Sequence, residues 1–504
     1  MSEYARELED DSFARSEEAF SGIVGWLRGA ESAQLTHAEL EEQLEARYRE
    51  TMRLLEQDHL DLRAAREQRL ERVTGPEGSA RTRAEAGHCR SLSGVFGPVT
   101  VSRIAYRAPG AANVHPADAQ LSLPPGKHSH GLGKLLAIEA PRGSIAQACA
   151  AVQRVTGVRL GTRQATALIC QDAYDFDGFY NDLEHRPPPQ AAPGAVLALS
   201  CDAKGIMMRP GQLRYRAARA AARATPKQQT RLSRGEVRTR KRMAEVGAVF
   251  GILPVPRTAA DILPRRPATA PPPAGPRATS KWVSASVATD AAAVVAGVLA
   301  EADRRDPDRQ RTWIALADGN VHQLARIRAE AQARGITITI ICDVIHVFEY
   351  LWKAAWCLFP EASPDAAPWV RARAHAILRG HARPVAAAIR DASTARQLTP
   401  AQRKQAATAA NYLDAKAPYL NYPAALAEGW PISSGVIEGT CRHLVKDRMA
   451  ITGARWGIDT AEAILKLRAL HANGDFDAYW TYHLQQEHHR NHQASYDHAA
   501  DIAA

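Results

Sequence analysis

The pattern of apolar and polar positions is clearest in the middle of the chain, between residues 196 and 341. Short apolar runs bounded by turn residues predict strands, and two longer segments with apolar residues every three or four positions predict helices. The predicted strands are Val196–Ser200, Val246–Gly251, Trp282–Ala288, Thr312–Ala317 and Ile336–Ile341, and the predicted helices are Asp290–Arg304 and Val321–Arg334. The order β-β-β-α-β-α-β, with continuous apolar runs in the later strands, indicates a sheet with helices on both faces.

The N-terminal part has a different pattern. Up to about residue 85, apolar residues recur at helical spacing among charges, and Thr36 with Glu39 forms a capping-box sequence. Residues 92–107 predict a short β-hairpin that turns at Gly97-Pro98. Two further apolar-periodic segments, Ser144–Val155 and Thr162–Asp172, predict a helix-turn-helix with Arg163 and Gln164 near the start of its second helix. An ordinary packed helix pair is the alternative interpretation.

Two insertions, and a proline-rich boundary at residues 186–194, complete the organisation. Residues 252–280 are dense in proline and predict an irregular connection, whereas residues 348–430 are rich in alanine and predict helices. We therefore expect a helical N-terminal region (1–90), a hairpin and helix-turn-helix region that binds DNA (91–190), the first part of an α/β core (191–347), a helical insertion (348–430), the last part of the core (431–475) and a polar C-terminal tail (476–504).

Composition narrows the class of protein. The chain has 504 residues, a net charge of +10 and a pI near 9.3, which favour a polyanionic partner such as nucleic acid. The seven cysteines are scattered without CxxC spacing, so neither a disulfide framework nor a structural zinc site is indicated. No apolar stretch approaches the length of a membrane span and no leader is recognisable, so we expect a cytoplasmic, nucleoid-associated protein.

Three acidic residues that lie far apart in the sequence are the main candidates for chemistry. Asp202 and Asp318 each follow an apolar run, and Glu438 lies near the start of a short predicted helix. Carboxylates placed this way can meet at one sheet edge and hold two divalent cations, as phosphodiester cleavage requires. The alternatives are an aspartate that caps a turn and a glutamate that a helix N-terminus favours. Glu349 and Glu462 are rival candidates for the third acid.

Basic residues are a second feature of the sequence that indicates a function. A run of arginines and lysines follows the first predicted strand, and Arg442 and Lys446 follow Glu438 at four-residue steps. Such runs are often solvated surface, but this position suits contact with a phosphate backbone. The candidate DNA-binding residues are Arg209, Arg214, Arg216, Arg238, Arg240, Lys241, Arg242, Arg442 and Lys446. The C-terminal histidines, His483, His488, His489, His492 and His498, are interpreted as part of a polar tail, since no carboxylate or thiol frame accompanies them.

Four segments together resemble a known family. Ser200–Arg209 around Asp202, Ala317–Asn320, Cys342–His346 and Gly435–His443 are similar to motifs of DDE-class insertion-sequence transposases of the ISKra group, which are related to Mutator-like and hAT-like transposases. The likeness extends from about Phe96 to Leu470. It implies an α/β fold: an RNase H-like catalytic core with a large helical insertion, plus a mainly helical N-terminal region.

The resemblance also implies roles for individual residues. Asp202, Asp318 and Glu438 would be the catalytic and metal-binding acids, while Asp343 and His346 would form a supporting motif. Because Asp318 and Asp343 both follow predicted strands, either could be the second metal ligand; strand order favours Asp318. The expected cofactor is Mg²⁺ or Mn²⁺, as two ions.

The implied function is DNA transposition by cleavage at insertion-sequence ends and strand transfer into target DNA. The expected partners are the terminal inverted repeats of the element, target DNA and further copies of the chain in a homodimer or larger assembly, with no membrane. Two alternatives stay open. One is a catalytically inactive, transposase-derived DNA-binding regulator, and the other is an RNase H-fold nuclease that does not transfer strands.

Overall fold

The computed structural model describes residues 12–75, 77–182, 187–215, 217–219, 241–264, 274–451 and 453–493. The chain divides into two compact units. The first unit comprises Met1–Asn181 and Phe476–Ala504, and the second comprises Asp182–Asp475. The chain therefore leaves the first unit, forms the second, and returns to the first at its C-terminal end. No helix among the described residues is long and apolar enough to cross a membrane.

The first unit begins with helices, as predicted, but they end earlier than expected. The N-terminal elements are α2 (Ala14–Leu27), the short η1 (Ser32–Gln34) and the 30-residue α3 (His37–Arg66). Thr36 and Glu39 form the predicted capping box at the start of α3. After Arg66 the chain becomes extended at Glu67, and a turn at Gly78, which has a φ of +76°, separates the short strands that follow.

The β-hairpin of the first unit is longer than the sequence indicated. Its strands are β3 (Arg83–Gly94) and β4 (Gly97–Arg107), and they follow a small pair, β1 (Val73–Thr74) and β2 (Ala80–Arg81). The turn lies at residues 95–96 rather than at Gly97-Pro98, since Gly94 pairs with Gly97. Most of β3 is polar and exposed or half-buried, so hydrophobic alternation could not reveal it.

Helices complete the first unit. They are α4 (Pro116–Gln120), α5 (His130–Glu139), α6 (Ile145–Thr156), α7 (Thr162–Asp172), α8 (Phe176–Asn181) and α21 (Phe476–Asn491). Helices α6 and α7 confirm the predicted helix pair, and Gly157 ends α6 with a φ of +73°. The expectation of a polar C-terminal tail is wrong for residues 476–491, because α21 buries Tyr479, Trp480 and His483.

The second unit is a mixed α/β structure built on a five-stranded sheet. Its strands are β5 (Val196–Met207), β6 (Lys241–Ile252), β7 (Ala278–Ser286), β8 (Trp313–Ala317) and β9 (Thr339–Cys342). The spatial order is β7-β6-β5-β8-β9. Strand β6 runs antiparallel to both of its neighbours, whereas β5, β8 and β9 are parallel. All five predicted strands are present, in the predicted succession with the two helices.

Helices cover both faces of this sheet. On one face, α11 (Ala291–Arg305) packs on β5, β6 and β7, and its Val298 approaches Gly247 so closely that a Cβ there would lie 2.3 Å from that side chain. Helix α12 (Val321–Ala333) contacts α11. The short helix α18 (Gly435–Thr440) contacts β5 and β6, and α20 (Ile458–Asn473) contacts β7.

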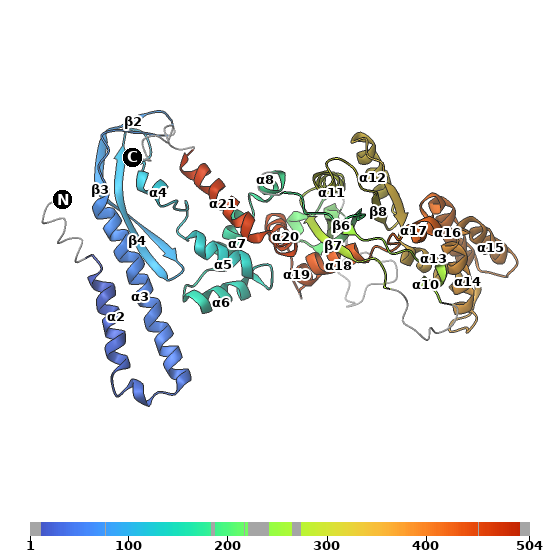
Figure 1. The fold of residues 1–504 in the computed structure, drawn as a ribbon, viewed down its shortest axis with the longest axis horizontal. Helices are drawn as coiled ribbons and strands as arrows, with labels where there is room; N and C mark the ends of the chain where they lie inside the picture. Colours follow the sequence, from blue (N-terminus) through green and yellow to red (C-terminus); the bar gives the residue numbers. More distant parts are fainter. Residues whose placement is uncertain are drawn as a thin grey trace. The chain divides into compact units, whose positions relative to one another are not determined.

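Between β9 and α18 the chain forms the predicted helical insertion. Its helices are α13 (Val344–Leu358), α14 (Ala366–Leu378), α15 (Ala382–Thr394), α16 (Pro400–Lys416), η3 (Ala417–Tyr419) and α17 (Tyr422–Ala427). Figure 1 shows α13 to α17 gathered into one bundle beside the sheet. The remaining short elements of the unit are η2 (Pro210–Gln212), α10 (Ala259–Ile262), the π-helical turn η4 (Cys441–Lys446) and α19 (Asp447–Met449).

Candidate functional site

Three aspartates lie in one row across the parallel strands. The register pairs Ser200 of β5 with Leu316 of β8, and Ala317 of β8 with Cys342 of β9. Continuing both registers by one or two residues sets Asp202 beside Asp318 and Asp318 beside Asp343. The backbone N–H of Asp343 donates to the carbonyl of Ala317 at 2.8 Å, which holds this end of the row together. Neighbouring strands are about 4.8 Å apart, so the three carboxylates share one sheet edge.

Asp202 lies within β5 rather than at its end, because the hairpin with β6 extends β5 to Met207. Its side chain is half-buried. One carboxylate oxygen accepts a hydrogen bond from the N–H of Ala203 at 2.7 Å, and the other accepts from the thiol of Cys441 at 3.3 Å. Burial, followed by the charge of Asp202, raises the pKa of Cys441, so this thiol stays protonated and remains a donor. A thiol is a weak donor, which leaves the Asp202 oxygens available to a cation.

Asp318 lies in a tight turn between β8 and α12. Its Oδ1 accepts from the N–H of Asn320 at 2.7 Å, and Asn320 in turn caps α12 by accepting from the N–H groups of His322 and Gln323. Gly319 has a φ of +89°, and a Cβ at this position would lie 2.8 Å from the hydroxyl of Tyr412. The turn therefore requires glycine. The second oxygen of Asp318 has no hydrogen-bond partner among the described residues, so it is open to a ligand.

Asp343 differs from Asp318 because its carboxylate is fully buried and already engaged. One oxygen accepts from the N–H of Ile345 at 2.7 Å and caps α13. The other accepts from the N–H of Ser434 at 3.0 Å and also from the Ser434 hydroxyl. Asp343 thus connects the end of β9 to the residue that precedes α18. These contacts suit a supporting side chain that positions Glu438.

Glu438 joins this edge of the sheet from α18. Its carboxylate, a carboxylate oxygen of Asp343 and a ring nitrogen of His346 lie within 4.8 Å of one another, close enough to hold a metal ion together. Glu438 is exposed, whereas Ile437, Cys441 and Leu444 are buried, as the predicted apolar stripe requires. His346 lies one turn into α13 and is 3.4 Å from Glu349. The structure therefore groups Asp343, His346 and Glu438, while Asp202 and Asp318 both line one hollow at the same sheet edge.

The rival acid Glu462 has a different position and different partners. Its carboxylate accepts hydrogen bonds from the hydroxyl of Ser286 and from the N–H groups of Val287 and Ala288, at 2.8, 2.8 and 3.0 Å. It therefore ties α20 to the end of β7, two strands away from β5. Glu349 is exposed on α13 beside His346. Of the two, only Glu349 is close to the row of aspartates.

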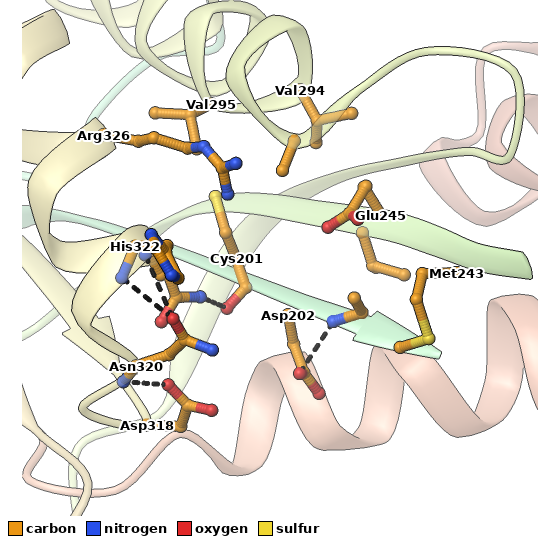
Figure 2. Close-up of a pocket in the computed structure, with 14 residues that line it drawn as sticks. Cys201, Asp202, Met243, Glu245, Val294, Val295, Asp318, Asn320, His322 and Arg326 are labelled. Atoms are coloured by element: carbon orange, nitrogen blue, oxygen red, sulfur yellow. Dashed lines mark hydrogen bonds between the residues drawn. The ribbon is translucent and has the colours of Figure 1, made fainter. Parts of the chain in front are cut away.

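A hollow of about 280 Å³ adjoins this edge, and its lining includes Asp202 and Asp318. Figure 2 shows both carboxylates on the same side of the strands, while Glu245 points to the other side with Val294 and Val295 of α11. Burial raises the pKa of Glu245. The sequence analysis did not single out Glu245 or Cys441. The pairing of Glu245 with Ala203 depends on the β5–β6 register, which no spacing along the chain reveals.

The candidate DNA-binding residues fall into separate groups. Lys241 and Lys446, together with Lys204 and Arg455, line a second hollow of about 470 Å³ that has no acidic residue in its described lining. Arg442 is 78% exposed and lies 3.8 Å from Asp447. The guanidinium of Arg242 donates to the carbonyls of Val287 and Ala288, so it has a structural role. Arg209 and Arg214 are exposed, and Arg216, Arg238 and Arg240 lie outside the described residues.

Comparison with protein-family models and with curated proteins finds no match to this chain. The functional argument therefore rests on the site itself: acidic side chains from β5, the β8–α12 turn, the β9–α13 junction and α18, with a cationic hollow at the far end of β5. Carboxylate and imidazole donors at this edge of the sheet could bind a metal ion.

Proposed function

We propose that this protein is a DNA transposase of the DDE class that cleaves the ends of an insertion sequence and joins them to target DNA. The observation that carries the proposal is the row formed by Asp202, Asp318 and Asp343, with Glu438 placed beside it by α18. The succession β-β-β-α-β-α-β, followed by a helical insertion and a glutamate-bearing helix, is the arrangement that an RNase H-like core of this family would have.

The donor set fits Mg²⁺ or Mn²⁺. Both cations prefer oxygen ligands, and Mg²⁺ is usually held by one or two carboxylates together with water and substrate phosphate. Asp202 and Asp318 offer oxygens that are not engaged by strong donors, and no described residue forms an ion pair with Glu438. Two bound cations would activate the attacking water or 3′-hydroxyl and stabilise the leaving oxygen of the phosphodiester.

The chain's own residues supply the positioning. The β5–β8 register and the turn after β8 would hold Asp202 and Asp318 near each other, so neither carboxylate would have to be ordered when a substrate phosphate binds. Ser434 and Asp343 hold the start of α18, which keeps Glu438 on the same edge. Lys204 follows Asp202 by two residues on β5 and is one of the residues that line the cationic hollow. This hollow would bind the phosphate backbone that flanks the scissile bond.

A strand-transfer assay tests the proposal. Labelled DNA that carries the terminal inverted repeats flanking the coding sequence is incubated with the protein and Mg²⁺ or Mn²⁺ in the presence of unlabelled target DNA. The proposal expects metal-dependent cleavage at the repeat end, followed by joined products. Cleavage without joining would favour a nuclease of the same fold, and binding without cleavage would favour a regulator; either result would contradict the proposal.

A further inference from the structure

Large apolar side chains are exposed on the helical hairpin that α2 and α3 form in the first unit. Within Ala14–Leu27, every residue of which the structure describes, only Ser16 is buried. The exposed apolar side chains of the hairpin are Phe20 (61% exposed), Leu27 (42%), Tyr48 (58%) and Leu55 (38%). The connected ends of the two helices extend beyond strands β3 and β4 (Figure 1). Exposed apolar side chains that gather on one surface mark an interaction site, so their arrangement decides what they can bind.

Two contacts fix how the helices of the hairpin are aligned. The backbone N–H of Ser16 donates to the carboxylate of Asp58 at 3.1 Å. Further along α2, the guanidinium of Arg47 lies 4.3 Å from the centre of the Trp26 ring. Helix α3 therefore runs antiparallel to α2, with residue 16 level with residue 58 and residue 26 level with residue 47.

The exposed apolar residues form one face of the hairpin. This apolar face comprises Phe20, Val24, Leu27, Tyr48, Met52 and Leu55. The three residues on α2 recur at helical spacing, about a quarter turn from the side that contacts α3. The three on α3 lie about a quarter turn from the side that contacts α2, in the same rotational sense. In an antiparallel pair, equal rotations in the same sense point to the same side, so the two rows lie next to each other.

Contacts on the other sides of the hairpin agree with this geometry. Arg15 and Asp61 belong to the opposite flanks of α2 and α3, and their charged atoms are 2.6 Å apart. Because the opposite flanks meet, the flanks that carry the apolar face also share a side. Leu60 of α3 packs in a cluster with Val99 and Val101 of β4, more than a quarter turn from the apolar face. The packing of β4 therefore leaves this face open.

Charged residues extend both rows in the same order. On α2, Glu17 precedes the apolar residues and Arg28 follows them, and on α3, Glu41 precedes them and Arg63 follows them. Each row thus runs from an acid, through apolar side chains, to a base. Two antiparallel copies of such a row bring the acid of each copy opposite the base of the other. The apolar face is therefore complementary to itself, which a different partner protein would not require.

We propose that the apolar face binds the same face of a second copy of this chain, so that two α2–α3 hairpins form an antiparallel four-helix bundle. In this two-fold arrangement α3 packs on α3 of the second copy, and α2 packs on its α2. Met52 lies close to the two-fold axis, beside its own counterpart. The dimer forms without DNA, so it does not depend on the proposed function.

One two-fold axis satisfies both rows of the apolar face. On α2, the axis that passes between Phe20 and Leu27 brings each of them opposite the other in the second copy, and Glu17 opposite Arg28. The same axis lies level with Met52 of α3, since residues 16 and 58 are level and the helices are antiparallel. On α3 it brings Tyr48 opposite Leu55, and Glu41 opposite Arg63. The apolar contacts are thus flanked by opposite charges at both ends.

Sedimentation of the purified full-length chain, without DNA, tests the interface. We expect a dimer at micromolar concentration. Tyr48→Asp places a charge within the apolar contact of both copies, and it should raise the dissociation constant by about 100-fold or more. Val155→Asp, at a residue of α6 that is 63% exposed, is the control and should dimerise as the wild type does. Circular dichroism checks that both variants are folded.

A charge exchange tests the orientation of the two copies. Glu41→Arg and Arg63→Glu should each weaken the dimer by a few-fold at low salt, because like charges then meet across the interface. The chain with both substitutions should regain the wild-type dissociation constant, since each new base again faces an acid. A double variant weaker than either single variant would contradict the antiparallel arrangement.

Cross-linking keeps the test decisive if Tyr48→Asp does not fold. Single cysteines are introduced after the exposed Cys89 is changed to serine. A short bismaleimide should join two chains through Met52→Cys, which lies beside its counterpart, but not through Arg28→Cys, which lies opposite Glu17. The proposal is overturned by a wild-type chain that is monomeric, by a dimer that Tyr48→Asp leaves intact, or by cross-linking through residue 28 and not residue 52.

Discussion

At the residue scale, the hydrogen-bond partners of each carboxylate distinguish candidate metal ligands from residues that position other side chains. Asp202 and Asp318 keep oxygens that face weak donors or none among the described residues, whereas both oxygens of Asp343 are engaged inside the protein. The sequence left the choice between Asp318 and Asp343 open, since both follow predicted strands. On the basis of these hydrogen bonds we propose Asp318 as the metal ligand and Asp343 as the residue that positions α18.

Comparison of Asp318→Asn with Asp343→Asn tests this assignment. We expect Asp318→Asn to bring metal-dependent cleavage to background at every Mn²⁺ concentration, because a ligand is lost. Asp343→Asn should retain cleavage reduced by about 10- to 100-fold, the usual effect of a residue that orients ligands. It should also lower the free energy of unfolding by roughly 1.5–3 kcal/mol, because a buried, charged acceptor is removed. The measurements are cleavage against Mn²⁺ concentration and denaturant unfolding; the reverse order of effects would refute the assignment.

Cys441 is a second residue whose role can be tested. Because its thiol donates to Asp202, Cys441→Ser should retain cleavage within a few-fold of wild type, whereas Cys441→Val should weaken it by about 10-fold and raise the Mn²⁺ concentration needed for half-maximal rate. Cys357→Val, at a buried cysteine of the insertion, serves as the matched control. A serine variant as impaired as the valine variant, at unchanged metal dependence, would mean that the thiol acts only by packing.

At the element scale, the sequence predicted which elements exist better than where they end. All five strands of the second unit, and the helices α11 and α12 that lie between them in the sequence, were predicted, since their apolar runs are buried. Strand β5 is longer than its apolar run because residues beyond Asp202 are held by pairing with β6, up to Met207 opposite Lys241. The hollow lined by Lys204 and Lys446 arises from the same pairing and from η4, so it could not be predicted either.

Lys204 and Lys446 provide an element-scale prediction about DNA binding. If each contacts one phosphate, changing both to Gln should weaken binding and reduce the slope of log affinity against log salt concentration by about 0.7–0.9 per lysine. The effect should be similar for different DNA sequences, because phosphate contacts carry no base information. Lys404→Gln, an exposed lysine on α16, is the control. An unchanged salt slope in the double variant would exclude this hollow from the DNA interface.

The packing of α3 on β4 gives a prediction about how the stability of the fold depends on pH. Glu67 follows α3 and accepts from the N–H of Ile104 at 2.8 Å, and burial raises its pKa. Because the folded-state pKa exceeds the unfolded one, stability falls as pH rises through the unfolded pKa towards the folded one, and the loss persists above that window. Glu67→Gln keeps an acceptor without the charge.

Thermal unfolding at two pH values checks this. Glu67→Gln should unfold at a higher temperature than wild type at pH 7, and the difference should shrink at about pH 4, near and below the unfolded pKa. The exposed Glu71→Gln should show no such gain. A stabilisation of equal size at both pH values would contradict the burial argument.

At the scale of the whole molecule, the candidate site is formed by segments around residues 202, 318, 343 and 438, while the first unit is completed by residues from the C-terminal part of the chain. The grouping of these four segments could be predicted from the sequence, because the order of the strands and the position of the helical insertion are visible in it. The completion of the first unit could not, because α21 has charged and histidine residues throughout, and burial of His483 depends on a pairing with Asp175 that local pattern does not encode.

The central claim is that Asp202, Asp318 and Glu438 together hold the cations that cut DNA. The most direct test measures Mg²⁺-dependent cleavage of a labelled repeat end, and binding to the same DNA, for wild type, Asp202→Asn and Glu438→Gln. We predict that both variants bind the DNA as wild type does and that neither cuts it above the level seen without metal. Cleavage at the wild-type rate by either variant would contradict the account.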